Sequence, residues 1–248
     1  MRLSGKSAIV TGGASGFGAG IARRFVLEGA QVVIADINGD AANAMAEELG
    51  DAATGIQVDV SAADDVANMA ESAMRSFGAI DILVNNAGVG HKPEALDTLS
   101  EEAFNRIFAV NIKSIYHTAQ KIVPIMKKNG SGAILNIGST GGVSPRPNLT
   151  WYNASKGWVI TATRSMAIEL AEFGIRVNAL NPVAGDTPLL KTFMGDDTPE
   201  IRAKFLASIP IGRFSTPEDM GAAACFLCSE DASMITGVAL EVDGGRCI

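Results

Sequence analysis

Residues 8–18 read Ala8-Ile9-Val10-Thr11-Gly12-Gly13-Ala14-Ser15-Gly16-Phe17-Gly18, a short apolar run followed by a cluster of glycines. The run predicts a β-strand, and a helical pattern begins near Ala19. Glycines at 12, 16 and 18 let the backbone turn tightly and approach a pyrophosphate, while the start of the helix supplies unpaired N–H groups. Because the cluster follows a strand and precedes a helix, it predicts a nucleotide-binding loop, in which we include Ser15 and Phe17.

Short β-branched runs and longer helical patterns alternate along the rest of the chain. This alternation is typical of βαβ units, and several runs are apolar throughout, as expected of strands covered on both faces. The sequence therefore predicts an α/β fold with a doubly wound, seven-stranded parallel sheet and helices on both faces. The predicted strands are residues 8–11, 31–36, 55–58, 80–84, 133–137, 175–180 and 238–242.

Two helix starts and one loop can also be predicted. Ser61 precedes an acidic first turn, and Thr216-Pro217-Glu218-Asp219 offers an N-cap residue, a proline at the first helical position and acidic residues near the positive end of the helix dipole. Residues 184–198 show little periodicity and are rich in Gly, Asp, Thr and Pro. A loop of this length in a compact domain is usually functional, so we predict a substrate lid over about residues 184–210.

Length and composition limit the class of protein. With 248 residues, 47% of them hydrophobic, the chain suits a single domain, residues 1–248. A net charge of −7, with no basic run longer than Lys127-Lys128, disfavours nucleic acid as a partner. We expect no membrane segment and, from three cysteines that cannot all pair with one another, a cytoplasmic protein. Cys225 and Cys228 lie in an apolar helical stretch and predict buried side chains, so we expect no metal site.

Asp36 ends the second predicted strand, at the separation from the glycine loop where a ribose-binding carboxylate is expected. It would repel the 2′-phosphate of NADP, and the neighbouring Ala14 and Ile37 supply no cation to bind one. The sequence therefore favours NAD over NADP. A turn-capping role for Asp36 remains the alternative. Asp59 ends the third strand and could meet the adenine amino group, although a role at the start of the next helix is an alternative.

Tyr152 and Lys156 are four residues apart and share one face if the segment is helical. A cation about 4 Å from a phenol, at an effective dielectric of about 20, favours the phenolate by roughly 4 kcal/mol, or up to about three pKa units before desolvation. We therefore expect Tyr152 to titrate near working pH and to serve as acid/base. Ser139 ends the fifth strand thirteen residues upstream, where it could donate to a substrate carbonyl.

These motifs, with Asn85-Asn86-Ala87-Gly88 and Asn111, resemble the short-chain dehydrogenase/reductase family in its single-domain form of about 250 residues. The resemblance spans nearly the whole chain and implies a Rossmann-type fold with strand order 3-2-1-4-5-6-7. It also implies a catalytic tetrad in which the tyrosine is acid/base, the serine orients the substrate oxygen, the lysine holds the nicotinamide ribose and the asparagine holds a relay water. The implied tetrad is Asn111, Ser139, Tyr152 and Lys156.

The resemblance extends the expected cofactor site along the chain. Asp59 and Val60 would flank the adenine, Asn86 to Gly88 would lie along the cofactor, and Thr187 would lie near the carboxamide. Two positions depart from the family pattern: Pro182-Val183 stands where the family has Pro-Gly, and Gly138 replaces a frequent serine. The full expected set is Gly12, Ser15, Gly16, Phe17, Gly18, Asp36, Ile37, Asp59, Val60, Asn86, Ala87, Gly88, Tyr152, Lys156, Pro182, Val183 and Thr187.

The resulting hypothesis is an NAD(H)-dependent oxidoreductase that interconverts a secondary alcohol and a ketone. One alternative is a 3-oxoacyl-[acyl-carrier-protein] reductase, which is normally NADPH-linked and docks an acidic partner. Asp36 opposes NADPH, and Glu169 and Glu172 make the helix after Lys156 acidic. The other alternative is a non-catalytic, nucleotide-sensing scaffold that kept the fold, which the complete tetrad disfavours.

The partners expected are a small-molecule alcohol or ketone and further copies of the chain. The resemblance implies a homotetramer in which the helix over about residues 102–127 and the helix after Tyr152 pack across a two-fold axis, with Ile107, Ile115 and Met166 assigned to either the interior or this interface. Substrate contacts are expected from loop and lid side chains, with Arg146 able to pair with an anion and His91 either touching substrate or facing solvent. The substrate set is His91, Arg146, Trp151, Leu189 and Phe193.

Overall fold

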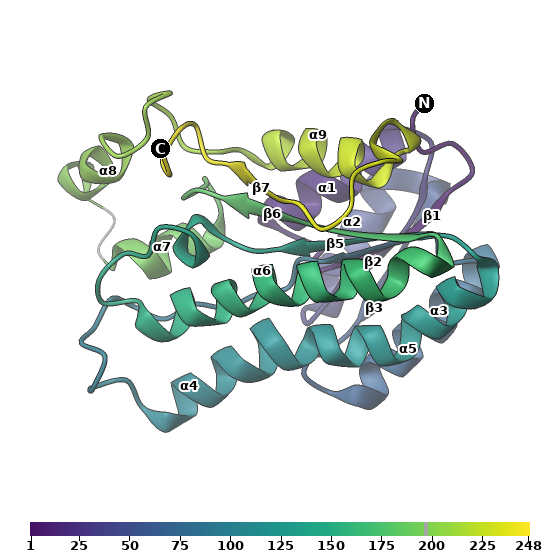
Figure 1. Ribbon diagram of the computed structural model, residues 1–248, viewed down its shortest axis with the longest axis horizontal. Helices are drawn as coiled ribbons and strands as arrows, with labels where there is room; N and C mark the ends of the chain where they lie inside the picture. Colours follow the sequence, from purple (N-terminus) through teal and green to yellow (C-terminus); the bar gives the residue numbers. More distant parts are fainter. Residues whose placement is uncertain (196–197) are drawn as a thin grey trace.

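The computed structural model describes residues 1–195 and 198–248 as a three-layer α/β/α structure (Figure 1). Its centre is a seven-stranded sheet in the order β3-β2-β1-β4-β5-β6-β7, and every pairing within it is parallel. The predicted fold class and strand order are confirmed. The strands are β1 (Ser7–Thr11), β2 (Gln31–Asp36), β3 (Ala53–Gln57), β4 (Ile82–Asn85), β5 (Gly132–Ile137), β6 (Ile175–Pro182) and β7 (Ala239–Val242).

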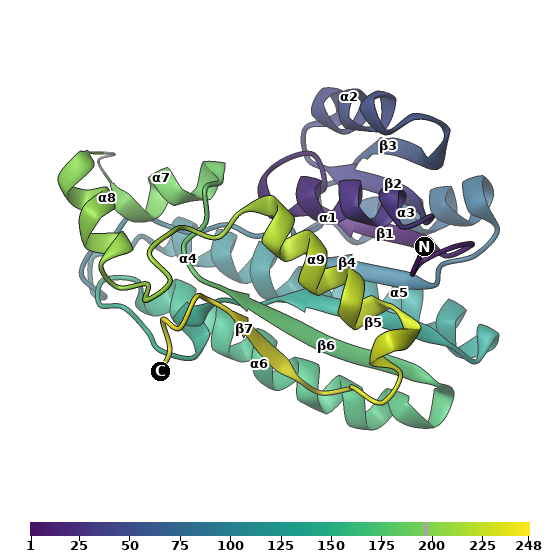
Figure 2. The ribbon, with the colours of Figure 1, turned by 90° about the horizontal axis from the view of Figure 1, so that it is seen from above.

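Two apolar clusters hold helices against the two faces of the sheet (Figures 1 and 2). Along β1 the faces alternate: Ala8 and Val10 belong to the cluster shared with α1, α2 and α9, whereas Ile9 belongs to the cluster shared with α3, α5 and α6. This double burial explains why the strands read as apolar runs. The helices are α1 (Gly16–Leu27), α2 (Gly39–Leu49), α3 (Ala63–Phe77), α4 (Glu101–Phe108), α5 (Ser114–Asn129), α6 (Thr150–Leu170), α7 (Pro188–Met194), α8 (Pro199–Leu206) and α9 (Pro217–Cys228).

The glycine loop joins β1 to α1 with little space to spare. Gly12 and Gly16 have φ angles of 60° and 51°, in the left-handed region that favours glycine. A Cβ at Gly18 would lie 2.1 Å from the carbonyl oxygen of Gly12, so only glycine lets the helix approach the loop this closely. The helix begins at Gly16 rather than near Ala19, because Gly16 and Gly18 belong to its first turn. Strand order reverses between β1 and β4, and their carboxyl ends therefore form the crevice where such sheets bind ligands.

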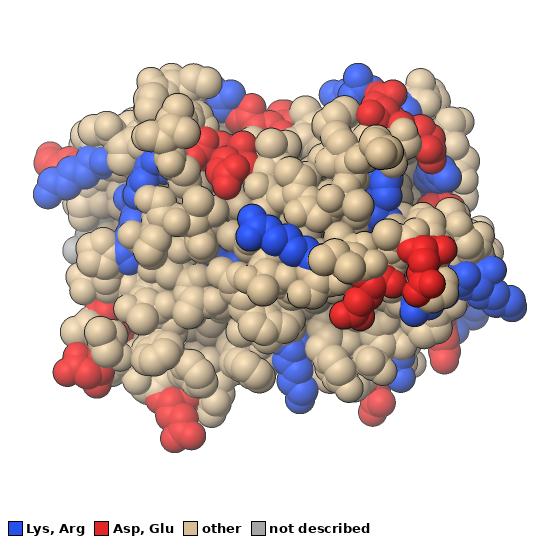
Figure 3. Space-filling view, viewed as in Figure 1, with Lys and Arg blue, Asp and Glu red and all other residues tan. Residues whose placement is uncertain are grey.

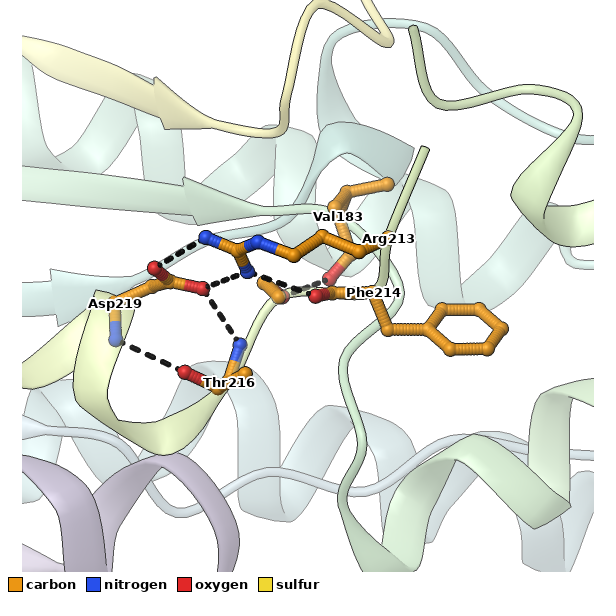
Figure 4. A network of polar contacts seen from close by, with 6 residues as sticks. Val183, Arg213, Phe214, Thr216 and Asp219 are labelled. Carbon is orange, nitrogen blue, oxygen red and sulfur yellow. Dashed lines mark hydrogen bonds and ion pairs between the residues drawn. The ribbon is translucent and has the colours of Figure 1, made fainter. Parts of the chain in front are cut away.

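The start of α9 is a capping box, shown in Figure 4, as the sequence predicted. The Thr216 hydroxyl accepts from the backbone N–H of Asp219 (3.3 Å), and the Asp219 carboxylate accepts from the backbone N–H of Thr216 (2.8 Å). Arg213 Nη2 donates to Asp219 Oδ1 at 2.9 Å, which lowers the pKa of that carboxyl to about 2. In the same network the Ser215 hydroxyl donates to the carbonyl of Val183 (3.2 Å), so the cap is linked to the end of β6.

The prediction that Ser61 caps the following helix is wrong. Helix α3 begins at Ala63 with Ala62 at the N-cap position and no side-chain cap. The Ser61 hydroxyl instead donates to the carboxylate of Asp59 (2.6 Å), because Asp59 lies two residues before it and closes a local turn.

The segment predicted as an irregular lid is largely helical. It forms α7 and α8, each with a proline in its first turn, and Thr198 caps α8 by accepting from the backbone N–H of Ile201 (3.3 Å). Helices of seven and eight residues are too short to show a hydrophobic period, which explains the error. Residues 196–197 of the predicted lid lie outside the described residues.

Helices α4 and α5 follow one another through a π-helical segment, Ala109–Lys113. Ile107 and Ile115 are buried in the subunit and Met166 packs against the core, so the subunit interior accounts for all three. Searched over its described residues, the chain has no helix long and apolar enough to cross a membrane. On the face shown in Figure 3, Lys and Arg are interspersed with Asp and Glu and form no continuous basic surface.

Candidate active site

One cavity of about 650 Å³ runs along the carboxyl ends of the strands. It collects the glycine loop, both strand-ending aspartates, the segment after β4, the ends of β5 and β6 and part of α7. Of the predicted site residues, those lining it are Gly12, Ser15, Gly16, Phe17, Asp36, Ile37, Asp59, Val60, Asn86, Ala87, Gly88, Ser139, Arg146, Tyr152, Lys156, Pro182, Val183, Thr187, Leu189 and Phe193. Gly18 and Asn111 do not line the cavity, but each lies against a glycine that does, Gly12 and Gly88 respectively.

Asp36 lies at one end of the cavity and has two local hydrogen bonds. Its Oδ2 accepts from the backbone N–H of Ala14 (3.1 Å) and its Oδ1 accepts from that of Asn38 (3.1 Å). The turn-capping role is therefore present, and each oxygen keeps lone pairs that remain able to accept. Ile37 beside it is 67% exposed and places no cation near the carboxylate.

Asp59 is engaged more fully by its own turn. Its Oδ1 accepts from both the backbone N–H (2.9 Å) and the hydroxyl (2.6 Å) of Ser61, while its backbone N–H donates to Asp65 (2.9 Å). Asp59 and Val60 nevertheless line the same end of the cavity as Asp36. The carboxylate is thus held in a fixed position at the cavity wall.

Asn86 acts on the loop through its side chain. Its Nδ2 donates to the carbonyls of Thr11 (2.8 Å) and Gly12 (3.0 Å), and the Thr11 hydroxyl accepts from the backbone N–H groups of Asn86 (3.0 Å) and Ala87 (3.1 Å). These bonds tie the end of β4 to the glycine loop across the crevice. At Gly88 an added Cβ would lie 3.4 Å from Lys156 Nζ, so this glycine keeps the approach to the lysine open.

Tyr152 and Lys156 both project from α6 and are buried, at 7% and 5% exposure. Lys156 Nζ donates to the carbonyl of Ile137 at the end of β5 (2.8 Å) and lies 6.0 Å from the centre of the Tyr152 ring. The Ser139 hydroxyl accepts from the backbone N–H of Gly141 (3.0 Å), which leaves its own proton free to be donated. Three groups able to move or donate protons therefore line one stretch of cavity wall.

The expectation that Tyr152 titrates near working pH does not hold for the protein alone. Burial raises the pKa of Tyr152 to about 12, although a hydrogen bond with Ser139 acts in the opposite direction. Burial also lowers the pKa of Lys156 to about 8. Desolvation dominates both shifts, and the ammonium donates to the Ile137 carbonyl rather than to the phenol oxygen. The phenol is thus protonated at neutral pH and available as a proton donor.

Asn111 lies within the π-helical segment and is 2% exposed. Its Oδ1 accepts from the backbone N–H of Val89 (2.9 Å), and its Nδ2 donates to the carbonyl of Val89 (2.9 Å) and to the hydroxyl of Ser155 (3.0 Å). A π-helical segment widens the turn and frees backbone groups, and such segments are frequent at functional sites. Asn111 thereby ties the segment after β4 to α6.

Helix α7 closes the cavity over the phenol. The Phe193 ring lies 4.7 Å from the Tyr152 ring, centre to centre, with 54° between their planes. A Cβ at Gly90 would lie 2.5 Å from the Phe193 ring, so glycine at this position leaves room for the ring. Phe193 occupies space beside the phenol that a substrate must share.

Two predicted substrate residues lie elsewhere. His91 is buried, with its Nδ1 2.8 Å from the carbonyl of Lys92 and 3.9 Å from the carboxylate of Glu94. Trp151 donates from Nε1 to the carbonyl of Leu96 (3.1 Å) and packs edge-on against Phe104. Neither residue lines the cavity as the described residues form it.

Comparison with known proteins agrees with this geometry. A family model described as enoyl-(acyl carrier protein) reductase matches residues 12–246. The chain belongs to the short-chain dehydrogenase/reductase family. Among curated members, it is 47% identical to a 4-formylbenzenesulfonate dehydrogenase of Comamonas testosteroni, over 100% of both chains. It is 41% identical to the 7alpha-hydroxysteroid dehydrogenase of Escherichia coli K12, over 99% of this chain and 95% of that protein.

A solved structure extends the comparison to three dimensions. The structure described as 3-ketoacyl-(acyl-carrier-protein) reductase from Brucella melitensis complexed with NADH superposes with a TM-score of 0.95 at 52% identity. The match covers 99% of this chain and 100% of that one. The fold of the present chain and the order of its motifs are those of the family. The protein is accordingly an oxidoreductase of this family.

The two departures from the family pattern have structural counterparts. Apart from glycines, Asn148 is the only described residue with positive φ, so Val183 needs no left-handed backbone where the family has glycine. At Gly138 an added Cβ would lie 2.1 Å from Asn181 Oδ1, so the missing serine side chain leaves room for this asparagine. Asn181 is fully buried, and neither its Nδ2 nor its Oδ1 has a partner among the described residues. The sequence did not predict this coupling, because the two positions lie on different strands.

Proposed function

We propose that this protein is an NAD(H)-dependent dehydrogenase that interconverts a secondary alcohol and a ketone, with Tyr152 as acid/base. The observation that most supports this proposal is that one continuous cavity has two ends with different side chains. Asp36 and the glycine loop line one end, whereas Ser139, Tyr152 and Lys156 line the other. This arrangement suits a nucleotide at one end and a reacting carbonyl at the other.

The residues present fit a dinucleotide cofactor. Gly12, Gly16 and Gly88 keep the cavity wall free of side chains where a backbone must approach a phosphate or ribose. Ser15 and Thr187 stand at the N-cap positions of α1 and α7, yet neither side chain makes a capping bond, so both hydroxyls can serve a ligand. When bound, the nicotinamide would donate or accept the hydride. Asp36 would hold the adenosine ribose, and Lys156 the other ribose.

The chain's own residues account for the proton. In the reducing direction Ser139 donates a hydrogen bond to the carbonyl oxygen, and Tyr152 transfers its phenol proton to that oxygen as the hydride adds to the carbon. The ketone gains one hydride and one proton and becomes the alcohol. The positive charge of Lys156 then stabilises the phenolate left behind. In oxidation the same phenolate accepts the alcohol proton, and Asn111 supports the relay through the segment it fixes.

The choice of NAD over NADP supplies the test. Asp36 carries a negative charge where a 2′-phosphate would lie, and no cation stands at Ile37. We expect initial rates with one accepted ketone to favour NADH over NADPH by at least about a hundredfold in kcat/KM, or about 3 kcal/mol. The double variant Asp36→Ala/Ile37→Arg should narrow or reverse this ratio, because it removes the repulsion and adds a phosphate partner. Equal use of both cofactors by the wild type would refute the assignment of Asp36.

The 3-oxoacyl-[acyl-carrier-protein] reductase alternative keeps specific support, because the Brucella structure carries that description and was solved with NADH. The exposed Glu169, on the helix of Tyr152, and the exposed Glu172, in the turn that follows this helix, disfavour an acidic carrier protein. A substrate panel for the NADH assay should therefore include an acetoacetyl thioester, simple ketones, and the aldehyde named in the Comamonas relative. We also propose that the protein is a cytoplasmic homotetramer and that residues 1–248 act as one domain.

A further inference from the structure

Arg146 brings a positive charge to the substrate end of the cavity. Its side chain lines the cavity together with Leu149 and Phe205. Nη2 donates to the Ser208 hydroxyl (2.8 Å), and the guanidinium lies 4.4 Å above the centre of the Phe205 ring. The backbone carbonyl of Arg146 accepts from Asn153, the neighbour of Tyr152 on α6 (2.8 Å). The guanidinium is thus held by Ser208 and by Phe205 of α8, and the Arg146 backbone is held by the catalytic helix.

Arg246 brings a second positive charge from the other end of the chain. Its Nη1 donates to the Ser144 hydroxyl (3.3 Å), and Ser144 also lines the cavity. The turn that carries it is fixed, because the Asp243 carboxylate accepts from the backbone N–H groups of Gly245 (2.9 Å) and Cys247 (2.8 Å). Figure 1 shows the C-terminus at the same end of the molecule as α7 and α8. The sequence did not point to Arg246, since it lies a hundred residues from Arg146.

The two arginines lack negative partners. Among the described residues, neither guanidinium forms an ion pair with a carboxylate; their side-chain partners are the hydroxyls of Ser208 and Ser144. The Nε of Arg246 is buried and has no partner among them. Burial and the charge of Arg246 both lower the pKa of Arg146, which indicates that the two cations lie near one another in a partly desolvated place. Such a pair is stabilised by an anion that enters between them.

We propose that Arg146 and Arg246 form an anion subsite, and that the substrate carries a carboxylate or sulfonate remote from its reacting carbonyl. The proposal rests on the dehydrogenase activity proposed above and specifies its substrate class. Planar guanidinium groups present N–H donors in the fixed geometry that oxyanions accept. Arg146 lines the cavity itself, whereas Arg246 is linked to it through Ser144, a lining residue whose hydroxyl accepts from Arg246 Nη1. Phe205 and Leu149 supply apolar surface beside the charge, which suits a carbon skeleton between the oxyanion and the carbonyl.

The test compares two substrates of similar shape and different charge. Rates of NADH oxidation are measured with the ketone 4-acetylbenzoate and with its neutral counterpart, 4-acetylbenzamide. We expect wild type to prefer the anion by at least about tenfold in kcat/KM, as charge-assisted hydrogen bonds discriminate on this scale. Arg146→Gln and Arg246→Gln should each lower kcat/KM with the anion much more than with the amide, and so remove most of this preference. Arg75→Gln, on the exposed surface of α3, serves as the matched control and should keep the full preference.

The outcomes separate the subsite from the proposed activity. Equal rates with the two ketones in wild type, or variants that lower both rates alike, would overturn the anion subsite and leave the dehydrogenase intact. If wild type with NADH reduces neither of them, calorimetric titration with benzenesulfonate decides the subsite alone: binding must be weakened in Arg146→Gln and unchanged in Arg75→Gln. The proposed activity itself fails only if no ketone is reduced. Should a glutamine variant not fold, Arg146→Lys keeps the charge without the planar geometry and should retain only part of the preference.

Discussion

Tyr152 is the residue on which the proposed chemistry depends most directly. Replacing it with phenylalanine keeps the buried ring against Phe193 and removes only the hydroxyl. We expect Tyr152→Phe to bind NADH with near wild-type affinity and to lose at least about a hundredfold in kcat, because a positioned acid/base group contributes on that scale. Fluorescence titration measures the first quantity and steady-state kinetics the second. A variant that retains more than about a tenth of the wild-type rate would contradict the role.

Lys156 offers a test of how the phenol is tuned. Burial raises the pKa of Tyr152 to about 12, even with the Ser139 hydrogen bond acting against it, and loss of the Lys156 charge would disfavour the phenolate further. Lys156→Ala should therefore weaken cofactor binding. It should also move to higher pH the rise of the rate of alcohol oxidation that follows ionisation of the phenol. Lys156→Arg keeps the charge and is the control. An unchanged profile with weaker NADH binding would show that the lysine holds the ribose and does not act on the phenol.

At the residue scale, the sequence predicted the members of the site better than their contacts. The glycine loop, Asp36, Ser139, Tyr152 and Lys156 follow from motif and position, and the structure brings them into one cavity. The direction of the tyrosine pKa could not be predicted, because burial and the Ile137 carbonyl that receives the lysine are consequences of tertiary packing. Contacts such as Arg146 with α8 likewise depend on how distant segments meet.

Among the elements, α9 offers a prediction about stability and pH. Asp219 completes the capping box and pairs with Arg213, and its pKa falls to about 2 from the ordinary value of 3.8. Because the folded state lowers this pKa, the contribution of the carboxylate is complete above about pH 4 and is lost as pH falls toward about 2. Asp219→Asn should cost about 1 kcal/mol of unfolding free energy near neutral pH, and little at the acid end.

Urea unfolding at pH 6 and at about pH 2.5 measures this difference, provided that the wild type is still folded at the lower pH. Glu218→Gln is the matched control, because Glu218 lies in the same helical turn and is exposed. Glu218→Gln should lower the free energy of unfolding by less than Asp219→Asn does, because Glu218 takes no part in the capping box. An Asp219→Asn cost that is the same at both pH values would show that the carboxylate charge contributes nothing to the cap.

Element boundaries could be predicted where local chemistry fixes them. The Thr216 cap was predicted correctly, because threonine, proline and two acidic residues in sequence leave few other conformations. The Ser61 cap was predicted wrongly, because the Ser61 hydroxyl bonds to the carboxylate of the nearby Asp59 instead of capping the helix. Helices α7 and α8 were missed because each is stabilised by what it covers, as Phe193 covers Tyr152, rather than by its own periodicity.

For the whole molecule, exposed apolar side chains indicate a surface through which copies assemble. Large apolar side chains are exposed on α4, α5 and α6, all on the side of the sheet opposite α9 (Figure 1). Trp158 and Ile168 on α6 are 40% and 81% exposed, and Tyr116 on α5 is 57% exposed. Solvent-facing side chains of this size, on neighbouring helices, favour burial against a second copy.

We therefore expect wild type to sediment as a tetramer at micromolar concentration. Tyr116→Glu combined with Ile168→Glu should shift the protein to a smaller species. In a two-fold symmetric contact, each new carboxylate would lie close to the same carboxylate of the second copy or would be buried without a partner. Leu27→Glu is the control: Leu27 is 69% exposed on α1, on the other face of the sheet, and its replacement should leave the assembly intact. Sedimentation velocity distinguishes the species directly. A wild-type monomer would refute the assembly, and a double variant that still sediments as the wild type would place the contact on other surfaces.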